Sequence, residues 1–361
     1  MATVERSILD AEHRALGARM TPFGGWDMPL QYDGVLEEHR RCREQAVVFD
    51  VSHLGNVRVG GPGAFDGLQG LLTNDLRKVE PGRAQYTHLL DEADAHVVDD
   101  IIVWWLASSG DGDDDFLVIP NASNTDPALA ALREAVPGGA VDEVTHTRSF
   151  LAVQGPEART RLKAVLPEAV DVGRFRVGTT MFAGAEVIVG GTGYTGEDGV
   201  ELYVPGSVAV ELWRAILAAG VTPAGLGARD TLRLEMGYPL HGHELGPGIT
   251  TLQAGLGWVV GWDKGPFRGS RALAAERDAG VARLLRGLTL EGRRPPREGY
   301  RVLCDGEPVG AVTSGNFSPT LNHGIALAFL RPDCEPGVTV EVEIRDKKEP
   351  ATVVDPPFVH R

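Results

Sequence analysis

The chain has 361 residues, and its 35 Lys and Arg against 50 Asp and Glu leave a formal net charge of −15 at pH 7. That acidic excess disfavours nucleic acid and anionic membrane surfaces as partners, because binding to either needs clustered Lys and Arg. Hydrophobic residues make up 43% of the chain, which excludes a wholly disordered protein, and the length predicts two or three domains at about 150 residues each.

Two helices are predicted near the N-terminus. Apolar side chains recur at helical spacing over residues 5–18. A segment at 22–29, which contains two glycines between prolines, breaks this pattern. A second helix is predicted over residues 34–46, where apolar positions again share one face.

A strand–helix pattern occurs twice in the middle of the chain. Residues 57–72 hold an alternating strand, a Gly-Pro pair and a helix, and residues 151–166 repeat this order, so matching positions differ by 151 − 57 = 94. Proline suits the first turn of a helix, because its missing N–H has no partner there. Each copy also ends in a strand, a proline and a helix, at 116–136 and 202–219. We therefore predict two diverged copies of an α+β unit.

The last part of the chain has a different pattern. A helix is predicted over residues 270–279, and short alternating strands separated by Gly and Pro are predicted at 287–290, 301–303, 309–312, 325–330 and 338–344. This spacing predicts an all-β barrel or sandwich of about 80 residues. We therefore expect the α+β region to occupy residues 1–280 and the β domain residues 281–361.

The glycine-rich segment 191–196 has the pattern of a dinucleotide-binding loop, and a predicted strand precedes it. The dinucleotide fold also needs a helix directly after this loop, whose N-terminus holds the pyrophosphate. Here two acidic residues and a further strand follow instead. A tight turn that presents Tyr194, Glu197 and Glu201 to a hydrogen-bond-donating ligand therefore fits better than a phosphate site.

Asp99 and Asp100 interrupt a very apolar run at residues 97–104. In a strand their side chains point to opposite faces, so one can reach solvent while the other faces the interior or a pocket. A buried carboxylate without a partner is costly, so such a group is hydrogen-bonded, protonated or functional. Asp100 shares its face with Trp104, which could wall a pocket. An edge strand with a solvated acid is the alternative.

Two further clusters allow both a structural and a functional interpretation. Arg229 and Arg233 share one face of a predicted helix over residues 225–235. They could belong to a salt-bridge network or to a binding site. His241 and His243 lie in a loop with one residue between them. That spacing suits hydrogen-bonded roles better than metal ligation, and we expect no metal.

These segments, in this order, resemble the glycine cleavage system T-protein family, the tetrahydrofolate-dependent aminomethyltransferases. The similarity spans nearly the whole chain, and the ordered set is far more specific than any single motif. The matching segments are FGGWDMPL at 23–30, VFDVSH at 48–53, TND at 73–75, PGRAQY at 81–86, VDDII at 98–102, VQGP at 153–156, TGYTGEDG at 192–199, GLGARDTLRLE at 225–235, GLGW at 255–258, TSGNFSPTL at 313–321 and PF at 357–358.

The resemblance implies an α+β fold of three domains arranged as a cloverleaf, with two α+β subdomains around a folate channel and a C-terminal β-barrel. It also implies an enzyme that takes the aminomethyl group carried on the dihydrolipoyl arm of lipoylated H-protein. The one-carbon unit passes to tetrahydrofolate, a co-substrate, to give 5,10-methylenetetrahydrofolate with release of ammonia.

The resemblance also implies roles for single residues. Asp100 matches the catalytic position and would contact the folate near N10. Glu201 matches the pterin-binding glutamate. The other positions that match the folate pocket are Arg229, Tyr194, Tyr86, Asn121 and Trp258.

The chain departs from the family pattern at several positions. Residues 94–96, with the sequence DAH, stand where relatives usually have a glycine pair, Trp104 and His241 stand where tyrosine is usual, and Asn322 replaces a glycine. These departures leave two alternatives open. One is a tetrahydrofolate-dependent demethylase of a small methylated compound. The other is a folate-binding iron–sulfur assembly factor, whose cysteine before the turn tyrosine is absent here.

Cysteine usage and the N-terminus predict the compartment. The three cysteines form no C-x-x-C pair, and no apolar signal segment begins the chain, so we expect a cytoplasmic protein without a membrane span. We expect a monomer or a weak dimer. Since H-proteins are acidic by the same resemblance, docking should use a local basic patch, for which Arg40, Arg41 and Arg43 are candidates.

Overall fold

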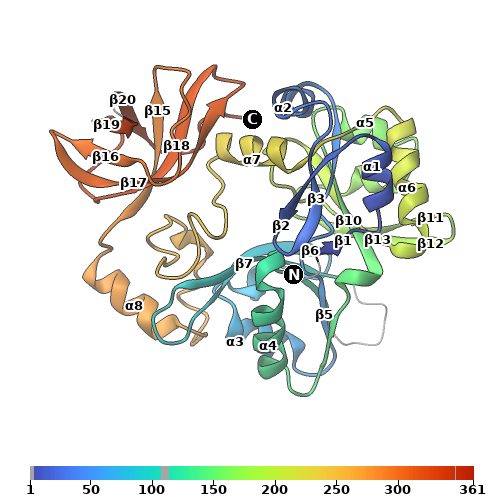
Figure 1. Ribbon diagram of the computed structural model, residues 1–361. Coiled ribbons are helices and arrows are strands. Elements are labelled where there is room, and N and C mark those ends of the chain that lie inside the picture. The colour runs from blue at the N-terminus through green and yellow to red at the C-terminus, as the bar shows by residue number, and fades with distance from the viewer. Residues whose placement is uncertain (1–3, 107–113, 346) are drawn as a thin grey trace. The chain divides into compact units, whose positions relative to one another are not determined.

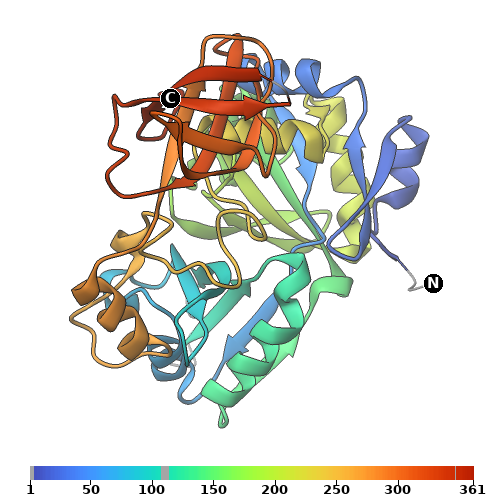
Figure 2. The same ribbon diagram turned by 60° about the vertical axis from the view of Figure 1, so that its left-hand side comes forward.

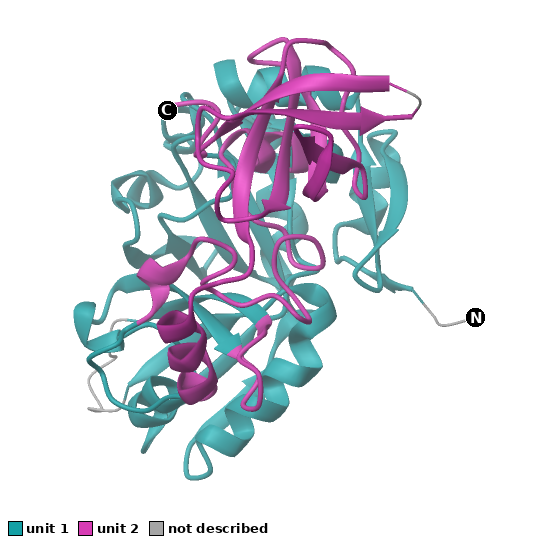
Figure 3. Ribbon diagram, turned by 90° about the vertical axis from the view of Figure 1, so that its left-hand side faces the viewer, with its two compact units in different colours: residues 1–89, 99–229, 261–267 teal, residues 90–98, 230–260, 268–361 magenta. Residues whose placement is uncertain are grey.

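The computed structural model describes residues 4–106, 114–345 and 347–361. The chain forms two compact units that interleave along the sequence and are coloured separately in Figure 3. The first contains residues 1–89, 99–229 and 261–267, and the second contains residues 90–98, 230–260 and 268–361. A domain boundary at residue 280 stays a prediction.

A small sheet opens the first unit. Its strand order is β1-β3-β2, formed by Glu5–Arg6, Trp26–Gln31 and Arg19–Phe23. The helix predicted over residues 5–18 is wrong in its first part, because α1 spans only Asp10–Ala15 and residues 5–6 pair with β3 as a strand. The Ser7 hydroxyl accepts a hydrogen bond from the Leu9 N–H at 3.1 Å, which turns the chain into the helix.

Two sheets of the α+β region share one topology (Figure 1). The order is β6-β7-β8-β5-β9 in one sheet and β11-β12-β13-β10-β4-β14 in the other, so four strands of each repeat occur in the same spatial order. This confirms the predicted duplication. The strands of the first sheet are, in spatial order, Arg83–Leu90, Val97–Trp105, Asp115–Ile119, Val57–Gly60 and Ala140–Glu143. Those of the second are Val177–Phe182, Ala185–Gly190, Gly199–Pro205, Arg148–Gln154, Val47–Asp50 and Thr222–Pro223.

Each repeat also contributes two helices, and α3 and α4 lie together in Figure 2. The helices are α3 (Ala64–Leu71), α4 (Thr125–Ala135), α5 (Ala158–Leu162) and α6 (Gly206–Ala218). Leu202 and Val204 of β13 belong to one buried apolar cluster with Trp213 of α6. Because side chains alternate along a strand, Glu201 points to the opposite face of β13. The helices thus cover one face and leave the other for polar residues.

The second unit contains a closed barrel with the strand order β15-β18-β17-β16-β19-β20. The strands are Leu284–Leu290, His323–Leu330, Glu307–Ser318, Arg301–Cys304, Thr339–Ile344 and Lys347–Val354 in the same order. This confirms the predicted C-terminal β-barrel, and α8 (Ser270–Ala279) matches the predicted helix. Strand β20 was missed, because its first half carries charged residues and a proline that hide the alternation.

Candidate active site

Asp99 and Asp100 lie in β7 and share a partner beyond the end of the neighbouring strand. β7 pairs antiparallel with β8 so that Ile102 faces Ile119, and the same register brings Asn121 beside the two acids. The Asn121 side-chain amide donates to Asp99 Oδ1 and Asp100 Oδ1, each at 2.8 Å. The carboxylates therefore converge on one amide, although strand alternation predicted opposite faces. The predicted difference in exposure is confirmed, because Asp99 is fully buried and Asp100 is partly exposed.

Burial raises the pKa of both acids. For Asp99 the charge of Asp100 adds to burial, and hydrogen bonds from the Asn121 N–H at 2.9 Å and the Asn124 amide at 2.7 Å oppose it. For Asp100 burial raises the pKa to about 6, against hydrogen bonds from Tyr86 and Asn121. The pair therefore keeps a proton to higher pH than isolated carboxyl groups, as is typical of functional carboxylates.

Tyr86 and His88 of β6 extend this group. The Tyr86 hydroxyl donates to Asp100 Oδ2 at 3.1 Å, and His88 Nε2 lies 3.2 Å from the same hydroxyl oxygen. Since that hydroxyl proton is used on Asp100, His88 donates from Nε2. Our sequence analysis missed His88, which is fully buried. Its spacing of two residues from Tyr86 within one strand was the available signal, because such residues share a face.

Glu201, Arg229 and Tyr194 form a second group. Glu201 is 6% exposed, and the Thr192 hydroxyl donates to its Oε2 at 2.5 Å. Arg229, in α7 (Leu226–Glu235), places its guanidinium 5.0 Å from the centre of the Tyr194 ring. Burial raises the pKa of Glu201, and the charge of Arg229 opposes this. Among the described residues Arg229 Nη1 has no hydrogen-bond partner, so this buried donor is available to a ligand.

The two groups meet at Tyr86. Its pKa is raised by burial and then by the negative charge of Asp100, and Tyr194 acts on it in the same direction, so the two groups are within electrostatic reach of one another. The structure therefore gathers the predicted site residues of the first unit: Asp100, Tyr86, Asn121, Glu201, Arg229 and Tyr194. Trp258 belongs to the second unit and is 63% exposed, and its role as a folate contact stays a prediction.

Arg233 has the structural role that the sequence left open. Its side chain is 2% exposed and pairs with Asp230 at 2.8 Å and with Glu244 at 3.2 Å. It also donates to Ser314 Oγ at 2.9 Å. The salt-bridge interpretation is therefore right for Arg233, whereas Arg229 stays with the polar group described above.

The structure accounts for three of the departures from the family pattern, through packing at Trp104 and through backbone conformation at Ala95 and Asn322. Trp104 is fully buried, with its ring 5.5 Å from that of Phe150. A Cβ on Gly190 would lie 2.2 Å from the same indole, so Trp104 fills the core and does not form the predicted wall of an open pocket. Ala95 and Asn322 have φ values of 59° and 62°, so each keeps the left-handed turn that glycine adopts most easily.

Helix α2 (Val35–Glu44) exposes only two of the three arginines of the predicted basic patch. Arg43 is buried and donates to the Thr195 carbonyl at 2.7 Å and to Glu197 Oε1 at 2.8 Å. The other two arginines of that patch form ion pairs with acids of the helix or of the preceding loop. Arg43 therefore serves to fix the turn that carries Tyr194.

Two family models together match most of the chain. The GCVT N-terminal domain matches residues 9–264, and the glycine cleavage T-protein C-terminal barrel domain matches residues 283–360. The chain belongs to the glycine cleavage T-protein family. An aminomethyltransferase of this family from Frankia alni is 47% identical over 99% of this chain and 99% of its own, and one from Mycobacterium bovis is 46% identical over 97% and 96%. The crystal structure of glycine cleavage system aminomethyltransferase T from Bartonella henselae has a TM-score of 0.91 at 32% identity, over 99% of this chain and 98% of its own.

Membership of the glycine cleavage T-protein family confirms the resemblance and the enzyme class predicted from the sequence. It favours an aminomethyltransferase over the demethylase alternative, because the relatives named above are aminomethyltransferases and the chain aligns with nearly their full length. Among the helices of the described residues, none has the length and hydropathy needed to cross a lipid bilayer.

Proposed function

We propose that this member of the glycine cleavage T-protein family takes the aminomethyl group from lipoylated H-protein and transfers its one-carbon unit to tetrahydrofolate. The observation that carries the proposal is the placement of Asp100. Its carboxylate is oriented by Tyr86 and Asn121 next to a second polar group that contains Glu201 and Arg229. The transfer yields 5,10-methylenetetrahydrofolate, free dihydrolipoyl H-protein and ammonia.

A carboxylate held in this way stabilises a developing positive charge. When N5 of tetrahydrofolate has bonded the carbon and both ammonia and the dihydrolipoyl thiolate have left it, the one-carbon unit is an N5-iminium cation, which N10 then closes. A fixed carboxylate in a water-poor site favours that charge with little reorganisation. The hydrogen bonds from Tyr86 and Asn121 fix the direction of the Asp100 oxygens. Asp100 therefore acts by electrostatic stabilisation and orientation rather than as an obligatory base.

The second polar group suits a reduced pterin ring. Tetrahydrofolate supplies N5 as the acceptor of the one-carbon unit, and the amino-amide edge of its pterin needs hydrogen-bond acceptors. Glu201 accepts one hydrogen bond from Thr192, and a carboxylate has capacity for more. Arg229 adds a buried N–H without a partner among the described residues, and Tyr194 adds a ring face beside it.

The decisive experiment follows the folate product formed by the full chain. Incubation with tetrahydrofolate and aminomethyl-lipoyl H-protein should yield 5,10-methylenetetrahydrofolate and ammonia in equal amounts. Omission of the lipoylated H-protein should abolish both products. Formation of 5-methyltetrahydrofolate from a small methylated amine, with no dependence on H-protein, would contradict the proposal and revive the demethylase alternative.

The pH dependence of turnover should report Asp100. Burial raises the pKa of this acid to about 6, and the ionised form is the one that stabilises positive charge. Activity should therefore fall by about tenfold for each pH unit below that value, and the limb belongs to the coupled pair Asp99 and Asp100. Measurement of kcat between about pH 5 and pH 8 checks this. The remaining activity of Asp100→Asn should lack the acidic limb, and an unchanged limb in that variant would assign it to another group.

A further inference from the structure

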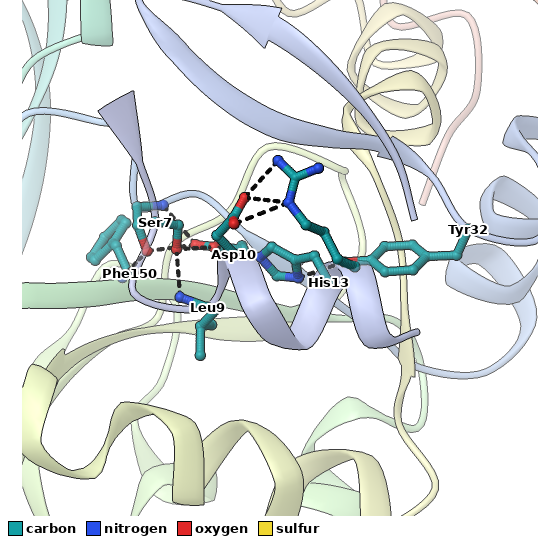
Figure 4. A network of polar contacts seen from close by, with 9 residues as sticks. Ser7, Leu9, Asp10, His13, Tyr32 and Phe150 are labelled. Atoms are coloured by element: carbon teal, nitrogen blue, oxygen red, sulfur yellow. Dashed lines mark hydrogen bonds and ion pairs between the residues drawn. The ribbon is translucent and has the colours of Figure 1, made fainter. Parts of the chain in front are cut away.

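The turn after β4 is fixed by a buried hydrogen-bond network (Figure 4). Asp50, at the end of β4, accepts hydrogen bonds from the Ser7 hydroxyl and from His13 Nε2, the latter at 2.8 Å. It also accepts from the Ser52 hydroxyl and, at 2.9 Å, from the Ser52 N–H. Ser52 Oγ in turn accepts from the Phe150 N–H at 2.9 Å. Several hydrogen bonds therefore hold residues 50–52 in place.

His53 follows directly and differs from these residues. It is 4% exposed, and its ring meets the Phe23 ring edge-on at 5.3 Å. The structure gives its buried Nδ1 no hydrogen-bond partner among the described residues. A buried polar atom without a partner costs about 1–3 kcal/mol. A bound ligand that supplies the missing hydrogen bond would remove this cost.

The position of His53 supports that reading. Two residues later the Gly55 N–H donates to the Pro120 carbonyl at 2.9 Å, which ties this turn to the segment that carries Asn121. On the other side, the Arg229 charge acts on the ring: burial and then Arg229 lower the pKa of His53 to about 4. His53 therefore lies on a turn that is tied to the segment of Asn121 and is within electrostatic reach of Arg229, and its imidazole is uncharged at neutral pH.

We infer that His53 is a further ligand-contacting residue, whose imidazole hydrogen-bonds an uncharged amide or amine of the bound substrate. This inference rests on the proposed function. Arg229 already supplies a positive charge for any anionic group, so a neutral imidazole beside it suits a neutral partner. The pterin ring of tetrahydrofolate and the aminomethyl nitrogen of the carrier both offer such chemistry. We assign the pterin, because Glu201 and Tyr194, the groups that suit that ring, lie beside Arg229.

The test compares two variants of the full chain. His53→Leu removes the hydrogen-bonding group, whereas His53→Gln retains a donor and an acceptor. Binding of tetrahydrofolate without H-protein should weaken by about tenfold in His53→Leu, a loss typical of one hydrogen bond in a buried site, and by less than about threefold in His53→Gln. Without ligand, His53→Leu should unfold at a Tm no lower than that of the wild type, because it removes an unpaired buried polar atom. The exposed His360 gives the matched control, since His360→Leu should change neither quantity.

Each other result counts against the inference. Equal binding by His53→Leu and the wild type would overturn it. Weaker binding together with a lower Tm in both variants would assign a structural role instead. Unchanged folate binding with a raised KM for aminomethyl-lipoyl H-protein would move the contact from the pterin to the carrier. Failure of the wild type to bind tetrahydrofolate would overturn the proposed function itself and the inference with it.

Discussion

Asp100→Asn should lower kcat by about 100-fold or more, because it removes the one charge that is aimed at the reacting carbon. The variant keeps the volume of the side chain. Its amide oxygen can accept from Asn121, and its N–H₂ group can donate to the Tyr86 hydroxyl oxygen when that hydroxyl turns its proton to His88 Nε2. Its Tm should not fall. The folded-state pKa of Asp100 is raised, so the ionised group lowers stability as pH rises past the ordinary carboxyl value, and a neutral amide escapes that cost. Single-turnover rates at saturating tetrahydrofolate and the thermal unfolding of the free protein check both parts.

A second variant controls for the loss of a charge in general. Asp142, in β9, is exposed, and Asp142→Asn should leave turnover unchanged. Near-normal turnover by Asp100→Asn would contradict the catalytic role. A Tm well below that of Asp142→Asn would show that the substitution disturbs the fold, and the rate loss could then not be assigned to charge.

Local sequence patterns predicted much of the fold because its elements are set by nearby residues. The period-two strands and the Gly-Pro helix starts of the two repeats depend on side chains only a few positions apart. The prediction of the first helix was wrong in its first part because of a contact distant in sequence. Its predicted first turn contains Ser7, whose hydroxyl is bound to Asp50, and a partner 43 residues away leaves no trace in helical periodicity.

The same distinction holds for the candidate site. Asp100 was singled out because a carboxylate inside an apolar strand is unusual wherever it occurs, and Glu201 because it follows the glycine-rich turn and matches a family position. His88 and His53 were not identified from the sequence, since a histidine in a strand or turn is common. The function of such a histidine depends on which of its atoms lack partners after folding. Arg43 was placed on the surface with its neighbours, because only the tertiary structure brings Glu197 to the helix.

Asp50→Asn should destabilise the protein by about 3 kcal/mol, because breaking a buried pair leaves its partner uncompensated. An amide at this position turns an N–H₂ group toward donors of Ser7, His13 and Ser52, which the carboxylate now accepts (Figure 4). Tm should fall by roughly 6–12 °C. Burial acts to raise the pKa of Asp50, but hydrogen bonds and the charge of His13 outweigh it and lower the pKa. This stabilisation is therefore present at neutral pH and is lost as pH falls below the ordinary carboxyl range.

The exposed ion pair between Arg14 and Asp27 provides the matched control within the same N-terminal segment. Asp27→Asn should cost less than about 1 kcal/mol, because solvent screens such a pair. Loss of the Asp50 network should also release the N-terminal segment locally, so trypsin should cleave after Arg14 and Arg19 faster in Asp50→Asn than in Asp27→Asn. Equal Tm values and equal cleavage rates in the two variants would show that the buried network does not hold this segment. In that case the turn that carries His53 would owe its position to the pairing of β4 with β10 and β14 and to the hydrogen bond from the Gly55 N–H to the Pro120 carbonyl.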